Sequence, residues 1–159
     1  MTDADTPMGF IDPAPTAGEP LPLLDDAAAI ELLGGARRIA VVGASPSPWR
    51  ASHAVMRYLL GQGYECVPVN PNHPQVLGRA CYPTLEAAAA QGGAFDIVDV
   101  FRRPEHTPAV ARSAVATGSR ALWLQQGVIN EEAVHIAHAG GLAVVMDRCT
   151  AVLHRHLRD

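Results

Sequence analysis

The sequence predicts an α/β fold: a doubly wound, mainly parallel, Rossmann-like sheet covered by helices on both faces. Strand-like and helix-like segments alternate five times along the 159 residues. The strand-like runs are apolar throughout rather than at every second residue, which is typical of strands buried on both faces. Short loops rich in Gly, Pro and polar residues separate these segments. Right-handed crossovers between parallel strands then give a Rossmann-like sheet.

A single domain is expected over residues 23–159. A chain of this length buries one core without disulfides or a structural metal. Residues 1–22 are rich in Pro, Asp, Thr and Ala and contain few large apolar groups. We expect this segment to be a disordered or loosely attached tail.

The charged residues favour a small anionic ligand. All 12 basic residues are Arg and none is Lys, which excludes catalysis by lysine and the Lys-dependent Walker loop. Residues 1–31 contain seven acids and no Arg, so the other 128 residues carry 12 Arg against nine acids. No dense basic stripe with interleaved aromatics is present, so a nucleic-acid partner is not expected.

A cytoplasmic protein without a membrane partner is expected. No apolar run approaches the roughly 20 residues that span a bilayer. The N-terminus lacks the basic start and apolar centre of a secretory signal. Cys66, Cys81 and Cys149 form neither a disulfide framework nor a zinc pattern, which indicates free thiols.

The first half of the chain contains a capped helix followed by two strand–helix units. Asp25 or Asp26 is suited to cap a helix over 27–33, and Gly34-Gly35 is expected to end it. Apolar residues at helical spacing then predict a helix from about Ser52 to Gln62. Strands are expected over Arg38–Val42 and Glu65–Val69, with a short extra strand over Arg79–Tyr82 and an alanine-rich helix from Thr84 to about Gln91.

The second half repeats the pattern. Thr107 as N-cap, with Pro108 at the first helical position, predicts a helix to Thr117. Asn130, followed by two Glu residues, opens the next helix, which Gly140-Gly141 ends. Strands are expected over Phe95–Phe101, Ala121–Leu124 and Leu142–Met146, with a last helical stretch toward His156. Trp123, within an apolar strand, is expected in the core.

Polar loops follow every predicted strand. In a parallel sheet these loops meet at one edge, and ligands bind there, where the strand order reverses. We expect five loops at this edge: 43–53, 70–74, 102–106, 125–128 and 147–149.

The loop after the first strand resembles a dinucleotide loop but lacks most of its fingerprint. The fingerprint needs three glycines in Gly-x-Gly-x-x-Gly, and only Gly43 is present. The second strand ends in Val69-Asn70, with no acid to hold a ribose. Binding of NAD(P) or FAD therefore remains only as an alternative.

The same loop is suited to phosphate. Ser45, Ser47 and Ser52 supply hydroxyls, and the start of a helix supplies free N–H groups. Arg50, Arg102 and Arg103 add charge-assisted donors. The alternative for the adjacent arginines is that one is a surface charge or pairs with Asp99 or Glu105.

Five motifs in order carry a resemblance to a known family. They are Val41-Val-Gly-Ala-Ser45, Val67-Pro-Val-Asn-Pro71, Asp96-Ile-Val-Asp-Val-Phe-Arg-Arg-Pro104, Trp123-Leu-Gln125 with Gly127-Val128, and Asp147-Arg-Cys149. Together they resemble the small bacterial and archaeal CoA-binding proteins, which are similar to the CoA-binding domain of the succinyl-CoA synthetase α subunit. The resemblance covers about residues 37–157.

The resemblance implies that coenzyme A or an acyl-CoA is the ligand. It implies a phosphoadenosine end at Gly43, Ala44, Ser45 and Arg50, with Asn70 and Pro71 beside the adenine or ribose. It places Phe101, Arg102 and Arg103 along the diphosphate and pantetheine, and Gln125 and Gly127 farther along the cleft. The phosphohistidine and ATP-grasp parts of the synthetases have no counterpart here, so ligase activity is not implied and no catalytic residue is assigned.

Two other classes of function stay open. One is an enzyme that uses acyl-CoA or a redox nucleotide through Cys149 or His106. The other is a homo-oligomer or a subunit that acts through a partner chain. The pairs His135/His138 and His154/His156 lack a third ligand at fixed spacing, so surface histidines rather than a metal site are expected.

Overall fold

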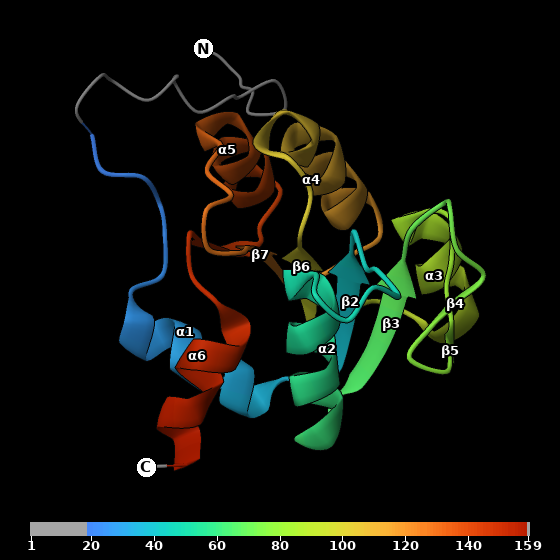
Figure 1. The fold of residues 1–159 in the computed structure, drawn as a ribbon. Helices are drawn as coiled ribbons and strands as arrows, with labels where there is room; N and C mark the ends of the chain where they lie inside the picture. The colour runs from blue at the N-terminus through green and yellow to red at the C-terminus, as the bar shows by residue number, and fades with distance from the viewer. Residues whose placement is uncertain (1–18, 159) are drawn as a thin grey trace.

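The structure is a computed structural model that describes residues 19–158, without the side chain of Arg158. Five parallel strands form its sheet in the order β3-β2-β6-β7-β8 (Figure 1). Their bounds are β2 Arg38–Val42, β3 Glu65–Val69, β6 Ile97–Val100, β7 Ala121–Leu124 and β8 Ala143–Met146. The predicted fold class is therefore confirmed.

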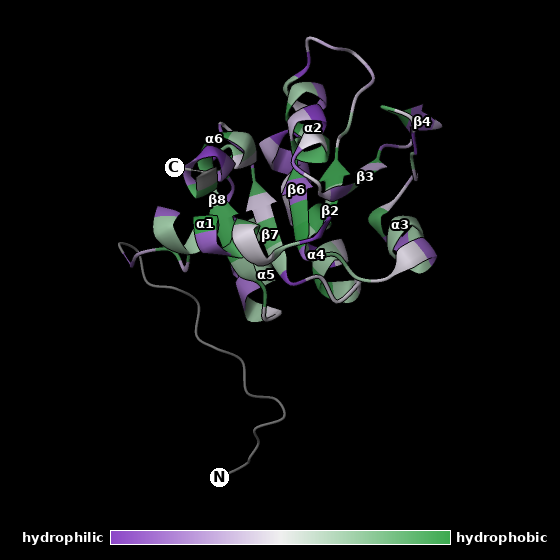
Figure 2. Ribbon diagram, turned by 90° about the horizontal axis from the view of Figure 1, so that it is seen from below, coloured by the Kyte–Doolittle hydropathy of each residue, from purple (hydrophilic) through white to green (hydrophobic). Residues whose placement is uncertain are grey.

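Helices cover both faces of the sheet (Figure 2). Because successive side chains of a strand point to opposite faces, Ala40 and Val42 of β2 pack on one core cluster while Ile39 and Val41 pack on the other. The first cluster joins the sheet to α3 Leu85–Gly92, α4 Thr107–Ala116 and α5 Glu131–Ala139. The second joins it to α1 Asp26–Gly35, α2 Ala51–Gly61 and α6 Thr150–Arg155. This alternation explains why the strands are apolar throughout.

The strand order places a switch point between β2 and β6. From β2 the chain moves to β3 at one edge, and from β6 it proceeds through β7 to β8 at the other. The loops after β2 and β6 therefore leave the sheet in opposite directions, and a crevice opens between them. The register pairs Val42 of β2 with Val100 of β6, so both strands end at the same level.

Several element boundaries differ from the predictions. Gly34 and Gly35 lie inside α1 rather than after it. Thr107 is the first residue of α4, not its N-cap, because a 3₁₀ turn over Pro104–His106 leads directly into the helix and the Thr107 hydroxyl donates to the Pro104 carbonyl. The expected short strand is half of an antiparallel hairpin, β4 Gln75–Val76 and β5 Arg79–Ala80.

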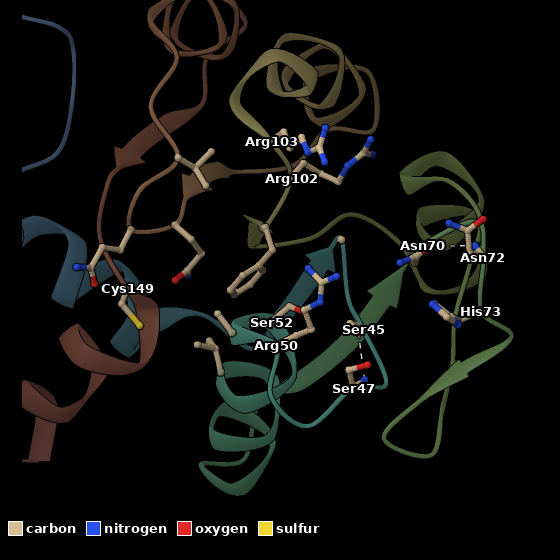
Figure 3. A pocket seen from close by; sticks show the side chains of 17 residues that line it. Ser45, Ser47, Arg50, Ser52, Asn70, Asn72, His73, Arg102, Arg103 and Cys149 are labelled. Carbon is tan, nitrogen blue, oxygen red and sulfur yellow. Dashed lines mark hydrogen bonds between the residues drawn. The ribbon is translucent and has the colours of Figure 1, made fainter.

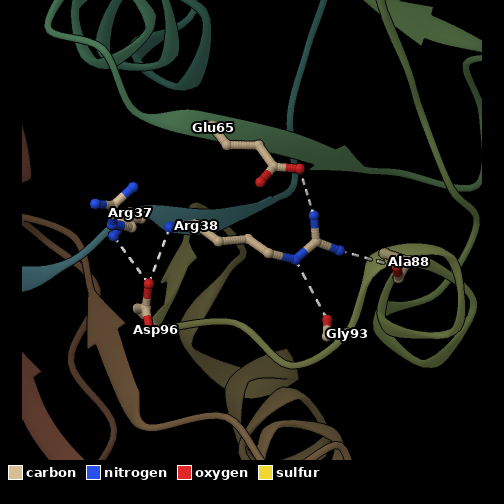
Figure 4. Close-up of polar contacts among 6 residues, drawn as sticks. All are labelled: Arg37, Arg38, Glu65, Ala88, Gly93 and Asp96. Atoms are coloured by element: carbon tan, nitrogen blue, oxygen red, sulfur yellow. Dashed lines mark hydrogen bonds and ion pairs between the residues drawn. The ribbon is translucent and has the colours of Figure 1, made fainter.

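An arginine network secures the amino ends of the strands, opposite the switch-point loops (Figure 4). The Arg38 guanidinium bonds Glu65 at 2.6 Å and the carbonyls of Gly93 and Ala88, and it lies 4.3 Å from the centroid of the Phe95 ring. The Asp96 carboxylate accepts from the backbone N–H groups of residues 37 and 38. This end of the sheet is thus held by polar contacts that take no part in the pocket described below.

His154 corrects the expectation of surface histidines. Its side chain is buried against the rings of Tyr58 and Tyr64, and Nδ1 lies 2.9 Å from the Tyr58 hydroxyl. Residues 19–158 contain no group of three or more His, Cys, Asp or Glu that could hold a metal.

The predicted tail lies mostly outside the described residues. Of its last part, Leu21 packs against the core. None of the helices over 19–158 is long and apolar enough to cross a membrane.

Candidate functional site

A pocket of about 980 Å³ opens at the switch point (Figure 3). Its volume is near the top of the range of about 300–1,000 Å³ found for ligand pockets. Its walls come from the loops after all five strands of the sheet and from the start of α2. Two smaller pockets elsewhere on the described chain have volumes of about 250 and 240 Å³. The edge expected from the sequence is therefore hollow at the place where α/β folds bind ligands.

Gly43 allows the loops after β2 and β6 to approach each other closely. Its φ is +86°, and a Cβ there would stand 2.8 Å from the Phe101 carbonyl oxygen. Its N–H donates to the Val69 carbonyl at 2.9 Å, which also ties the loop to β3. A side chain at this position would push the two loops of the crevice apart.

The α2 N-terminus offers free donors to the pocket. Arg50, Ala51 and Ser52 line the pocket, and the N-cap Arg50 makes no side-chain capping bond. The first N–H groups of a helix have no partner within the helix and carry the positive end of its dipole. Just before them, the Ser45 hydroxyl accepts from the Ser47 N–H at 3.1 Å and shapes the turn. This arrangement is suited to an anion.

Three arginines give the pocket a positive charge. Arg50 lies on the α2 side and Arg102 and Arg103 on the β6 side (Figure 3). None of the three forms an ion pair within residues 19–158, so the alternative of a pair with Asp99 or Glu105 is wrong for that part of the chain. No Asp or Glu of the described residues lines the pocket. The uncompensated charge favours a polyanionic ligand.

Asn70 connects the loop after β3 to the loop after β2. Its Nδ2 donates to the Ala44 carbonyl at 2.8 Å, and its Oδ1 accepts from the Asn72 N–H at 2.9 Å. Asn72 and His73 extend this wall of the pocket (Figure 3). The loop is thus held by this side chain together with a backbone hydrogen bond from the Asn70 N–H to the Tyr82 carbonyl at 2.9 Å.

A buried carboxyl lies behind the far wall. Asp99 is fully buried in β6 and accepts from Gln125 at 2.5 Å and from the Thr150 hydroxyl at 3.1 Å. Burial raises the pKa of Asp99 to about 7, although the hydrogen bonds from Gln125 and Thr150 lower it in part. Gln125 borders the pocket and so does Cys149, whereas His106 lines the smaller neighbouring pocket.

Nine of the twelve predicted site residues line the pocket: Gly43, Ser45, Arg50, Ser52, Asn70, Phe101, Arg102, Arg103 and Gln125. The other three do not line it: Ala44 is buried in the core, Pro71 is exposed, and Gly127 binds Asp147 through its N–H. Lining residues not assigned to the site from the sequence are Ser47, Ala51, Val55, Asn72, His73, Gln126, Val128 and Cys149. Most of these are neighbours of assigned residues in the same loops, so taking whole loops as the site would have included them.

The structure is thus a Rossmann-like α/β domain with a pocket at the switch point that three arginines line. A family model described as a CoA binding domain matches residues 37–155. The chain therefore belongs to the CoA binding domain family.

Relatives agree with this membership. The uncharacterized protein YneT of Bacillus subtilis is 42% identical over 124 residues, which are 78% of this chain and 90% of that protein. A hypothetical protein from Pyrococcus horikoshii superposes with a TM-score of 0.81 at 36% identity. The match covers 91% of this chain and 99% of the Pyrococcus chain. An acetyl-coenzyme A synthetase from Ca. Korarchaeum cryptofilum superposes with a TM-score of 0.61 at 26% identity. This match covers 69% of this chain and 26% of the synthetase chain.

Proposed function

We propose that this chain binds coenzyme A or an acyl-CoA in the switch-point pocket and has no ligase activity of its own. The observation that carries the proposal is a set of three arginines that form no ion pair within residues 19–158. They lie beside the N-terminus of α2, in a pocket that no acid of those residues lines. CoA carries a diphosphate and a 3′-phosphate, which such a site would neutralise. Membership of the CoA binding domain family supports the same ligand.

The arrangement of loops supports an order for the parts of CoA. The phosphoadenosine end would lie against Gly43, Ser45 and the start of α2, with Asn70 beside the adenine or ribose. Arg102 and Arg103 would hold the diphosphate. The pantetheine arm would then run past Phe101 toward Gln125 and Cys149, which border the pocket at the ends of β7 and β8.

The proposal excludes ligase activity of this chain because most of a synthetase has no counterpart in it. The match covers 69% of this chain but only 26% of the Korarchaeum synthetase. The alternative of an enzyme that uses acyl-CoA keeps one supporting observation, the Cys149 thiol at the pocket. Acyl-CoA turnover that disappears in Cys149→Ser would favour that alternative.

Calorimetric titration of the full chain with CoA and, separately, with NAD tests the proposal. Saturable binding of one CoA per chain, with little or no response to NAD, is expected. No heat and no thermal shift with CoA, together with clear saturation by NAD, would overturn it.

A further inference from the structure

Three buried polar side chains form a closed cluster behind the pocket. Asp99 lies within β6, Gln125 directly follows β7, and Thr150 is the first residue of α6. Their exposed fractions are 0%, 4% and 0%. Burying a polar group without a hydrogen bond is costly, so each donor and acceptor of the cluster is expected to have a partner.

The hydrogen bonds within the cluster determine the orientation of the Gln125 amide. The Thr150 hydroxyl donates its single hydrogen to Asp99 Oδ2 at 3.1 Å. Gln125 Nε2 has two hydrogens, and it donates to Asp99 Oδ1 at 2.5 Å and to Thr150 Oγ1 at 2.9 Å. When the Asp99 carboxylate is ionised it can only accept, so in that state the nitrogen and not the oxygen of the amide faces it.

One polar atom of the cluster is left over. Gln125 Oε1 accepts no hydrogen bond from any residue of the described chain, 19–158. Yet Gln125 borders the pocket. The atom that the cluster leaves for a ligand is therefore an acceptor, and a ligand group that meets it must be a donor.

We propose that Asp99 and Thr150 are positioning residues that hold Gln125 Oε1 as an acceptor for an amide N–H of the bound ligand. This inference rests on the proposed function, because the pantetheine arm of CoA carries two secondary amides. Gln125 directly follows β7, which lies two strands from β2 in the sheet order. At about 4.8 Å per strand, that is roughly 10 Å from the phosphate loop, a distance that the arm spans.

The test compares CoA with adenosine 3′,5′-bisphosphate, which keeps the adenine and two phosphates but lacks the arm. Affinities for both are measured by calorimetry at pH 8, where Asp99 is charged, for the wild type, Gln125→Met, Thr150→Val and the conservative Thr150→Ser. Loss of one hydrogen bond weakens CoA binding about fivefold to tenfold in Gln125→Met and Thr150→Val. Binding of the bisphosphate stays within about twofold, and Thr150→Ser keeps wild-type CoA affinity.

Equal weakening of both ligands, or unchanged CoA affinity in Gln125→Met, would overturn the inference while leaving CoA binding intact. A wild type that binds neither ligand would instead overturn the proposed function, and the inference with it.

A measurement on the unmodified protein covers the case in which the variants do not fold. By NMR, the Gln125 side-chain amide protons are expected to exchange slowly with solvent both with and without CoA. Rapid exchange, or loss of their hydrogen bonds on CoA binding, would contradict the proposed orientation.

Discussion

Replacement of Gly43 by alanine is the most severe single test of the crevice between β2 and β6. The new Cβ would stand 2.8 Å from the Phe101 carbonyl oxygen, 3.1 Å from its carbon and 3.2 Å from Arg102 Cδ. Two of these atoms are backbone and cannot rotate away, so the loop after β6 must move. An L-residue in the left-handed region costs roughly 1–2 kcal/mol, and overpacking adds about 1–3 kcal/mol.

The expected loss of unfolding free energy is therefore about 2–5 kcal/mol. At about 2–4 °C per kcal/mol for a chain of this size, Tm falls by at least about 4 °C. Thermal and urea unfolding without ligand measure this loss. A CoA titration of the folded variant then shows at least tenfold weaker binding, because the loops that present Arg50 and Arg102 have moved apart.

Gly61→Ala is the matched control. Gly61 ends α2 and lies outside the left-handed region, and a Cβ added to it would meet no atom within 4 Å beyond its own helix backbone and chain neighbours. Alanine in a helix is favoured by up to about 1 kcal/mol, so Tm is expected to stay the same or rise slightly. If Gly43→Ala unfolds at the wild-type temperature and binds CoA normally, the close approach of the two loops does not matter and the reasoning is refuted.

Three further predictions concern charged groups. Arg50→Ala should weaken CoA binding about tenfold or more, since charge-assisted hydrogen bonds contribute about 1.5–3 kcal/mol. Arg57 is exposed on the same helix but lies outside the pocket, so Arg57→Ala should bind CoA normally in the same titration. Burial raises the pKa of Asp99 to about 7 in the folded protein, so the folded state holds this proton more tightly than the unfolded state. The free energy of unfolding should therefore fall as pH rises from about 4 to 7, by at most about 1.4 kcal/mol per pH unit. In urea unfolding, Asp99→Asn should lack this pH dependence, and the same pH dependence in both proteins would contradict the buried charge. Arg38→Ala should lower the free energy of unfolding by about 1–3 kcal/mol. Its CoA affinity should not change, because the contacts of Arg38 lie at the opposite end of the sheet. Weaker CoA binding by the fully folded variant would show that the two ends of the sheet are coupled.

The fold was predictable because its signals are local. A run such as Arg38–Val42, followed by Gly43 and a helix start, specifies a strand, a turn and a helix without reference to the rest of the chain. The parallel arrangement brings the loops to one edge, so the position of most site residues also followed from the pattern. Where a turn ran on into a helix, as before Thr107, the local signal for a cap misplaced the boundary by one residue.

The polar cluster was not predictable from local signals. In the sequence, nothing distinguishes Asp99 from the other residues of an apolar strand. Only the register that pairs Asp99 with Trp123 shows which face of the sheet its side chain occupies. Gln125 and Thr150 are 25 residues apart and meet Asp99 only once β6, β7 and α6 are packed. Which polar atoms remain free for a ligand therefore depends on tertiary contacts.

Backbone NMR of the full chain, with and without saturating CoA, tests the central claim most directly. Chemical-shift changes should cluster in the loops after β2, β3, β6 and β7, with the largest at Gly43, Ser52 and Arg102. The strand starts around Arg38 and Glu65 should not respond. Absence of shifts at saturating CoA, or shifts confined to the Arg38 end of the sheet, would contradict a CoA site at the switch point.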